Sequence, residues 1–476
     1  MIDAVRIRRN TVFSFAAALI RMLATMLMFV GIARFFGPEA FGQFALAHTY
    51  LTIFYIIADF GIDILFMAEL PHRREETGQF IRRFFSLKTI LSLLALCGMC
   101  GVAFLSGMSE ATRILMFVMS AAIIGNSATV FVLGILKGHE QFSFEAHTSF
   151  WQHLVLLVGL LILGFLEADI VAVAGFFVFS RFIGFFYVLP RALKYLKQTP
   201  IQWSVREWLP ALRDVAPFGF HILLGTLYFQ LDTILISVYQ GDYRVGIYQS
   251  AMKLVMLSLV VSDVASGAFM PTLARLLREN EERAVKAARL FAKVLLYVGM
   301  PVALMFFMFP HEILVIVYGG EEFAGAGLVL KILALTVFLR FATDAYAMFL
   351  TASGRQTRRA VISAVSSGVS FVLNILLIPR YGIEAAAAVS VAVHLLAGGL
   401  AIVLQDPRNR SVLVQPDMRR GVVVLVLVIV TAVLVAAETT SVVLGAGLIL
   451  TSATVSAWFF GMTAEERTAV LRMAGT

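Results

Sequence analysis

Several charged and hydrogen-bonding side chains stand inside long apolar stretches of this sequence. A charge at the centre of a membrane costs at least about 2.5 to 3.5 kcal/mol on insertion scales, so such a residue usually faces a partner or a water-filled cavity. At 100° per residue, the polar side chains of each of four stretches share one helical face. The four faces carry Arg21; His48, Tyr55 and Asp59; His221 and Asp232, with Gln230 on the opposite side; and Gln249, Lys253 and Asp263. We expect these faces to line a hydrated cavity of mixed charge, and the alternative is that the charges pair only to hold helices together.

Three further ionisable residues lie within apolar stretches. Arg181 has no acidic neighbour on its own predicted helix, which favours a cavity role. Arg340 and Asp344 are four residues apart, so they either neutralise each other or face the cavity, and both interpretations stay open.

Signatures of catalysis and metal binding are missing from the sequence. It contains no G-x-S-x-G, H-E-x-x-H or Walker-type motif, and its two cysteines are not combined with a second metal-binding pair. We therefore expect no enzymatic activity, no catalytic residue, no metal and no cofactor.

The elements that must position these residues are membrane helices. Of 476 residues, 60% are hydrophobic and only 14% are charged, and the mean hydropathy is +0.89, which one soluble core cannot accommodate. A helix that crosses the hydrocarbon core needs about 20 apolar residues. Fourteen windows satisfy this: 12–36, 43–67, 88–107, 113–136, 148–166, 170–190, 216–239, 246–270, 290–310, 326–352, 361–378, 383–404, 421–437 and 441–461. The predicted fold class is an all-α polytopic membrane protein with about 14 transmembrane helices.

The distribution of basic residues predicts the orientation. Both tails and the even-numbered connections hold 28 Lys and Arg residues, including Lys88 and Lys137, whereas the opposite set holds four. Basic residues near span ends stay on the cytoplasmic side, so both termini are expected there. The basic residues behind the net charge of +8 then lie mainly in loops at the membrane surface, where they can bind lipid head groups. No nucleic-acid partner is expected.

An internal repeat is visible at an offset of 204 residues. Residues 37–63 align without a gap over 241–267, which matches Gly37 with Gly241, Gly42 with Gly246 and Asp59 with Asp263. Chance can produce such a match in apolar sequence, but both halves also share their predicted topology. We predict two six-helix lobes in parallel pseudo-repeat, at 1–215 and 216–404, followed by two additional helices in 421–461.

Three stretches carry a family resemblance: "ARFFGPEAFGQFALAHTYLTIFYIIADFGID", "ILVIVYGGEEFAGAGLVLKILAL" and "LNILLIPRYGIEAAAAVS". With them, residues 1–404 resemble the polysaccharide transporters, or Wzx-type lipid-linked oligosaccharide flippases, of the multidrug/oligosaccharidyl-lipid/polysaccharide exporter superfamily. The resemblance implies alternating access around a V-shaped cavity in the bacterial cytoplasmic (inner) membrane. The implied cargo is a polyprenyl-diphosphate-linked glycan, moved to the periplasmic leaflet for a surface polysaccharide such as O antigen or exopolysaccharide.

The resemblance also suggests roles for individual residues. Arg21 and Lys253 match positions of cavity cations on the first and eighth helices of such flippases, and with Arg181 they would offset the charge of a diphosphate. A further arginine found on the second helix of related flippases is replaced here by His48 and Asp59. The substrate-binding candidates are Arg21, Lys253, Arg181, His48, Tyr55, His221 and Gln249. The candidates for proton or sodium coupling are Asp59, Asp232 and Asp263.

Other functions stay open at this point. A cation-coupled multidrug exporter of the same superfamily is one alternative, although such exporters usually stop at twelve spans. A membrane glycan polymerase or transferase is another, and the absence of a large external loop argues against it. The sequence leaves open the glycan, the coupling ion, the oligomeric state and any glycan polymerase or export complex that would act as a partner.

Overall fold

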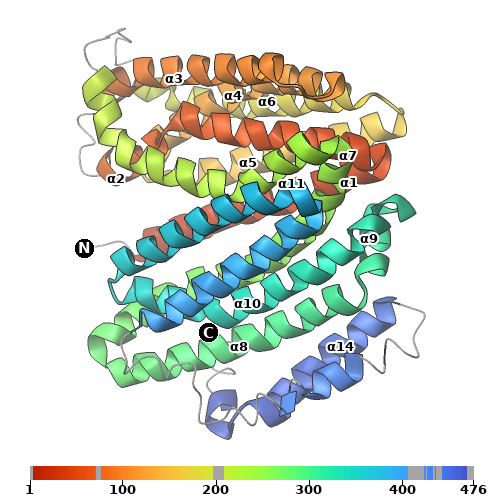
Figure 1. Cartoon of the computed structure of the whole chain (residues 1–476). Coiled ribbons are helices and arrows are strands. Elements are labelled where there is room, and N and C mark those ends of the chain that lie inside the picture. Colours follow the sequence, from red (N-terminus) through yellow and green to blue (C-terminus); the bar gives the residue numbers. More distant parts are fainter. Residues whose placement is uncertain are drawn as a thin grey trace. The chain divides into compact units, whose positions relative to one another are not determined.

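The computed structural model of the chain describes residues 4–70, 77–196, 208–405, 423–424, 426–432, 435 and 442–468. Within these ranges the ordered elements are helices and none is a strand, so the all-α prediction is confirmed (Figure 1). The chain divides into two compact units, Met1–Gly246 and Ile247–Thr476. The predicted lobe boundary at residue 215 stays a prediction.

The first unit contains six helices and the beginning of a seventh. They are α1 (Ala4–Asp59), α2 (Ile62–Glu69), α3 (Thr77–Leu105), α4 (Glu110–Gly138), α5 (Ser143–Phe165), α6 (Ile170–Leu196) and the part of α7 (Trp208–Glu279) that precedes the unit boundary. Helix α4 packs along α6 and α3, while α1 packs along α5. Helix α5 therefore lies next to α1.

The second unit continues from α7. Its elements are α8 (Glu281–Met308), α9 (Pro310–Tyr318), a 3-10 turn (Glu321–Ala326), α10 (Gly327–Ala352), α11 (Gln356–Val403), α14 (Val442–Ser456) and a π-helical turn (Ala457–Gly461). Helix α10 packs against both α8 and α11, and α14 packs against α8.

Nine described helices are long and apolar enough to cross a membrane. Three of them, α1, α7 and α11, bend at Gly37, Gly241 and Gly382, so each holds two of the predicted spans. The twelve predicted spans from 12–36 to 383–404 thus fall on these nine helices. The predicted 441–461 span corresponds to α14 and its π turn, whereas 421–437 lies partly outside the described residues. The chain is a multi-pass membrane protein, and its helices are compatible with fourteen spans.

The two bends at Gly37 and Gly241 support the predicted repeat. Their φ and ψ angles are 75° and 179° at Gly37, and 81° and 178° at Gly241, a conformation that glycine adopts readily and other residues rarely do. The aligned pair Gly42 and Gly246 also makes matching contacts inside the first unit. A Cβ at Gly42 would lie 2.0 Å from the Asp242 carbonyl oxygen, and one at Gly246 would lie 1.9 Å from the Pro38 carbonyl oxygen. These close backbone contacts require glycine on both sides.

The predicted continuous span at 43–67 is wrong in one respect. Helix α1 ends at Asp59 and α2 begins at Ile62, because Phe60 and Gly61 have φ angles of 44° and 86°. At this break the backbone approaches the start of α7 closely, since a Cβ at Gly61 would lie 2.7 Å from Phe218 Cβ. The break falls between two acidic residues, Asp59 and Asp63.

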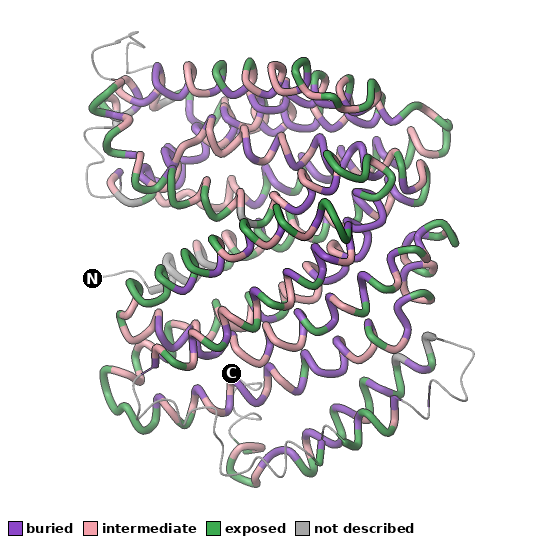
Figure 2. The backbone as a smooth tube through the Cα atoms, viewed as in Figure 1, coloured by how far each residue is buried: buried purple, intermediate pink, exposed green. Residues whose placement is uncertain are grey.

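Small residues let the helices of the first unit pack closely. A Cβ at Gly159 on α5 would lie 1.9 Å from the ring of Phe176 on α6, and one at Gly184 on α6 would lie 1.8 Å from Gln152 on α5. Such contacts hold membrane helices together because lipid offers no hydrophobic driving force between them. Buried and exposed positions alternate along the long helices (Figure 2), and many of the exposed side chains are large and apolar, as expected for surfaces that face lipid.

Candidate functional site

A polar cluster of the first unit begins at Arg21 on α1. The Arg21 guanidinium lies 3.2 Å from a Glu145 carboxylate oxygen and donates to the Ser149 hydroxyl at 3.1 Å. Glu145 and Ser149 are one turn apart on α5, so they present the same face to α1. The Arg21 side chain stays 44% exposed. An ion pair of this exposure contributes about 0 to 1 kcal/mol, so Arg21 can exchange its acidic partner easily.

The same face of α5 continues to His153, one turn further along. His153 is buried and its Nδ1 lies 2.7 Å from the Ser149 carbonyl oxygen. It interacts electrostatically with both Arg181 and Arg21. Glu145, Ser149 and His153 were not predicted as site residues, although their spacing of four residues indicates one polar helical face.

Arg181 on α6 is the most deeply buried cation among the predicted site residues. The residue is 8% exposed and its guanidinium lies over the Phe177 ring, 4.4 Å from the centroid. Among the described residues, no carboxylate lies within 4.0 Å of it, and its Nε atom has no hydrogen-bond partner. Burial of a charge without compensation is unfavourable by several kcal/mol. Arg181 is therefore suited to receive an anion.

Tyr55 and His48 lie near these cations, as their predicted common face requires. Tyr55 interacts electrostatically with Arg21 and Arg181. The His48 ring packs edge-on against Phe177, the same ring that carries Arg181, with centroids 5.9 Å apart. The structure thus brings four of the predicted substrate-binding residues into one region of the first unit.

Two buried ion pairs flank the break between α1 and α2. Lys88 on α3 donates to Asp59, and Lys137 on α4 donates to Asp63 at 2.8 Å. The side chains of the two lysines are only 6% exposed. From the sequence, both lysines were counted among the basic residues of the cytoplasmic connections. The structure places them on α3 and α4, paired with the two acids, and their cytoplasmic side stays a prediction. We call the whole group the first-unit cluster: Arg21, Tyr55, Asp59, Asp63, Lys88, Lys137, Glu145, His153 and Arg181.

The residues predicted on the first part of α7 divide between buried and exposed positions. Asp232 is buried and its carboxylate accepts hydrogen bonds from the backbone N–H and the hydroxyl of Thr233, at 2.7 and 3.2 Å. Gln230 accepts a hydrogen bond from Thr49 on α1 at 3.1 Å, while His221 is exposed. Gln230, which the sequence placed opposite Asp232, therefore contacts α1.

The second unit has its own polar cluster, built by α7 and α10. Arg340 lies 2.9 Å from Asp263 and 3.4 Å from Asp344, so the i,i+4 pairing considered from the sequence is present and is shared with a third residue. Asp344 also accepts hydrogen bonds from Ser262 at 2.8 Å and Ser266 at 2.9 Å. The second-unit cluster comprises Ser262, Asp263, Ser266, Arg340 and Asp344. The Asp263 side chain is 60% exposed, so this cluster is open on one side.

Two predicted substrate-binding residues, Gln249 and Lys253, also belong to the second unit. Gln249 is buried and Lys253 is half-buried on α7.

Within the part of the chain that the structure describes, no group of three or more His, Cys, Asp or Glu residues is arranged to hold a metal ion.

Comparison with known families gives two matches. The family described as "Polysaccharide biosynthesis protein" matches residues 7–277, and the family described as "MatE" matches residues 217–379. The chain is also 23% identical over 382 residues to the probable low-salt glycan biosynthesis flippase Agl15 of Haloferax volcanii, covering 77% of this chain and 78% of that one.

Solved structures show the same fold. The lipid II flippase MurJ in an inward closed conformation superposes with a TM-score of 0.75 at 14% identity, over 94% of this chain and 98% of that chain. An inward-facing multidrug resistance MATE family transporter of the MOP superfamily gives a TM-score of 0.62 at 16% identity, over 82% and 95%. The chain thus has the fold of the multidrug/oligosaccharidyl-lipid/polysaccharide exporter superfamily, which the sequence motifs predicted.

Proposed function

We propose that this chain, which belongs to the polysaccharide biosynthesis protein family, is a flippase for polyprenyl-diphosphate-linked oligosaccharides. It moves the lipid-linked glycan from the cytoplasmic to the outer leaflet of a bacterial cytoplasmic membrane by alternating access, with both of its termini in the cytoplasm. The glycan feeds a surface polysaccharide such as O antigen or exopolysaccharide, with a glycan polymerase or export complex as the next partner. The activity breaks no covalent bond, so the chain needs no catalytic residue, metal or cofactor.

The observation that carries this proposal is the buried, uncompensated guanidinium of Arg181. A diphosphate brings about two negative charges that must leave water on entry into a membrane protein, and an arginine fork matches phosphate oxygens in two hydrogen bonds. No carboxylate of the described residues lies within 4.0 Å of Arg181. A bound phosphate would therefore supply the charge compensation that the protein itself does not.

Arg21 adds a second, exchangeable contact. Its present partner, Glu145, is an anion held at 3.2 Å on an exposed guanidinium. A phosphate oxygen can replace this carboxylate with little loss, because the exposed pair contributes about 0 to 1 kcal/mol. Tyr55 and the Ser149 hydroxyl supply neutral hydrogen-bond donors in the same region. Together these residues would fix the diphosphate while the polyprenyl chain stays in lipid.

Ion coupling is assigned to the acidic residues as part of the same proposal. Of the three candidates, Asp59, Asp232 and Asp263, we assign the exchange of a proton or a sodium ion to Asp263, and this exchange would bias one conformation over another. Asp263 is the most accessible of the three, since Asp59 and Asp232 are shielded. Ion exchange at Asp263 would release Arg340, which then becomes available to an anionic substrate.

One observation favours a second function, a cation-coupled multidrug exporter: the MatE family matches residues 217–379. A cationic drug would be repelled by Arg181, which has no acid to neutralise it among the described residues. Drug accumulation in cells with and without the gene separates the two functions, because the exporter predicts a difference and the flippase does not.

The proposal is tested with the purified chain in liposomes that contain a fluorescent polyprenyl-diphosphate trisaccharide. A glycosidase added outside cleaves only the outer-leaflet lipid in protein-free vesicles, and we expect it to cleave nearly all of it when the wild-type chain is present. Arg181→Met should reduce the additional cleavage at least about tenfold, which corresponds to about 1.4 kcal/mol of lost binding. Arg191→Met is a matched control on the same helix, since Arg191 is exposed. Equal flipping by the wild type and Arg181→Met would contradict the proposed diphosphate contact.

A further inference from the structure

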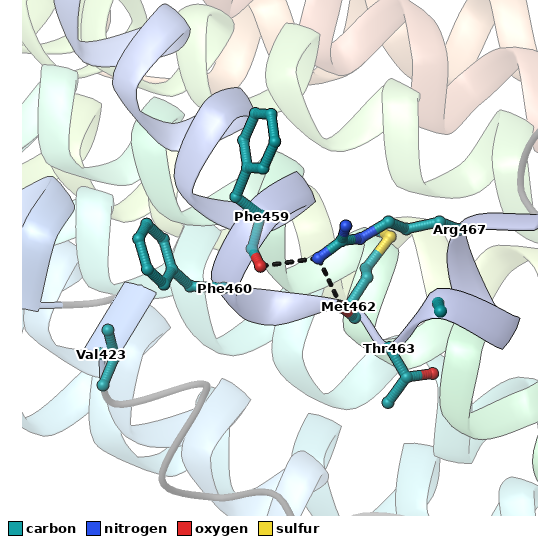
Figure 3. A pocket seen from close by; sticks show the side chains of 7 residues that line it. Val423, Phe459, Phe460, Met462, Thr463 and Arg467 are labelled. Carbon is teal, nitrogen blue, oxygen red and sulfur yellow. Dashed lines mark hydrogen bonds between the residues drawn. The ribbon is translucent and has the colours of Figure 1, made fainter.

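A pocket of about 430 Å³ opens in the second unit, just beyond α14, and none of the predicted site residues lines it. Its apolar wall consists of Val423, Phe459, Phe460 and Met462, and its polar end of Thr463 and Arg467 (Figure 3). The polar residues and Val423 lie on opposite sides of the pocket. The lining is therefore amphipathic along its length.

Among the described residues, no carboxylate neutralises the charge of Arg467. Its Nη2 donates to the carbonyl oxygens of Phe459 at 2.7 Å and Met462 at 3.2 Å, which are uncharged acceptors. Its Nε atom is buried and has no hydrogen-bond partner within the described ranges, and no carboxylate there lies within 4.0 Å of it. A guanidinium has five N–H donors, so most of them remain available for an anion.

The neighbouring acid is already engaged elsewhere. Both carboxylate oxygens of Glu466 lie 2.9 Å from Lys293 on α8, and one of them accepts the backbone N–H of Thr463 at 2.8 Å. The Thr463 hydroxyl accepts the Glu466 backbone N–H in return, at 3.2 Å, which is a capping box. This arrangement fixes the backbone at the polar end of the pocket and keeps Glu466 from compensating Arg467.

The order of residues along the pocket also suits a membrane lipid, which changes from apolar to charged along its length. Phe459 and Phe460 are 60% and 54% exposed in the π turn that ends the apolar α14 segment, and Arg467 follows less than ten residues later. Aromatic and cationic side chains at a span end are typical of the membrane–water interface. An acyl chain suits the exposed rings, and a head-group phosphate suits the guanidinium.

We propose that this pocket binds an anionic glycerophospholipid, with its phosphate on Arg467 and Thr463 and an acyl chain along Phe459, Phe460 and Val423. The site is separate from the transported lipid, since it contains no residue of either polar cluster. Arg467 gives it a preference for anionic over zwitterionic head groups, because each basic side chain near an anionic membrane surface adds attraction.

The test uses the purified full-length chain, reconstituted in an equimolar mixture of phosphatidylglycerol and phosphatidylcholine and analysed by native mass spectrometry for retained lipid. We expect the wild type to retain phosphatidylglycerol about fivefold over phosphatidylcholine. Arg467→Gln keeps an N–H donor for the backbone carbonyls but loses the charge, so the two lipids should be retained nearly equally. Arg467→Lys should restore most of the preference.

A charge-matched control and a mapping step make the result specific. Arg283→Gln removes one exposed charge elsewhere in the second unit and should keep the wild-type preference. A photoactivatable phosphatidylglycerol should crosslink to peptides from residues 442–468. Equal retention of both lipids by the wild type, an unchanged preference in Arg467→Gln, or an equal loss in Arg283→Gln would each overturn the proposal.

Discussion

Asp59 and Asp263 occupy equivalent positions in the repeat, yet their surroundings differ. Each follows its bent glycine by 22 residues, from Gly37 to Asp59 and from Gly241 to Asp263. The Asp59 side chain is 14% exposed and pairs with Lys88, whereas the Asp263 side chain is 60% exposed and pairs with Arg340. In the first-unit cluster, Asp59 therefore belongs to a shielded ion pair. In the second-unit cluster, the equivalent Asp263 belongs to an exposed one.

The difference separates a structural role from a switching role. Breaking a buried pair leaves an uncompensated charge and costs about 3 to 5 kcal/mol, while an exposed pair contributes about 0 to 1 kcal/mol. The Asp59 pair is suited to fix α3 against α1 next to the helix break. Asp263 is suited to exchange its partner for a proton or sodium ion during transport.

The largest expected effect comes from breaking the shielded pair. Lys88→Met leaves Asp59 buried without a partner and should lower stability by about 3 to 5 kcal/mol, measured as the loss of folded protein on heating in detergent. The double variant Lys88→Met/Asp59→Asn removes both charges and should recover most of the loss. A single variant as stable as the wild type would show that the pair is not structural.

Arg181→Met tests a buried cation that has no acidic partner among the described residues. Its removal relieves an uncompensated charge, so thermal stability should stay the same or rise, while flipping falls at least about tenfold. The opposite responses of Lys88 and Arg181 to the same substitution would sharpen the contrast between paired and unpaired cations. A fall in stability as large as that of Lys88→Met would instead assign Arg181 to the core.

Substitution of the repeat-related acids should distinguish ion coupling from structure. Asp263→Asn should change the pH or sodium dependence of flipping and shift stability by no more than about 1 kcal/mol. Asp59→Asn should mainly lower stability, because Lys88 is then left buried and unpaired. The initial rate of glycosidase cleavage, followed across pH and sodium concentration, gives the readout. A wild type without any such dependence would remove the coupling role of Asp263.

The smallest effect is expected at the Lys293–Glu466 pair. The Glu466 side chain is 26% exposed, a value between those of Asp59 and Asp263. Burial raises the pKa of Glu466, but hydrogen bonds from the Thr463 N–H and from Lys293 outweigh it and hold the pKa below the ordinary value. The pair therefore stabilises the fold at neutral pH, and this contribution is lost as pH falls through the lowered pKa. Limited proteolysis near residue 466 should increase in acid for the wild type and depend less on pH in Glu466→Gln.

The sequence predicted the helices and the repeat well because both depend on local patterns. Apolar windows located the spans, and the aligned glycines mark the bends at Gly37 and Gly241. A hydropathy window of about 20 residues does not resolve an irregularity of two residues, so it missed the break at Phe60 and Gly61, where α7 approaches closely.

The sequence predicted only part of the candidate site, because spacing along one helix is visible in the sequence and pairing between helices is not. Helical phase identified the polar faces that carry Arg21 and Tyr55, because it uses only spacing along one helix. Arg181 was selected because no acidic residue lies on its own predicted helix. Lys88 and Lys137 were missed because a lysine near a span end reads equally as a loop residue or as a snorkelling side chain. Their acidic partners lie on other helices, and such tertiary pairing has no local signature in the sequence.

The most direct test of the proposed function measures the sidedness of polyprenyl-diphosphate glycans in a strain that lacks the gene. A lectin or glycosidase added to intact spheroplasts reports the glycans exposed on the outer face. We predict that complete repeat units accumulate on the cytoplasmic face and that the wild-type gene restores their exposure, while Arg21→Ala and Lys253→Ala, present at wild-type abundance, do not. Normal exposure in the deletion strain, or full restoration by both variants, would contradict the account.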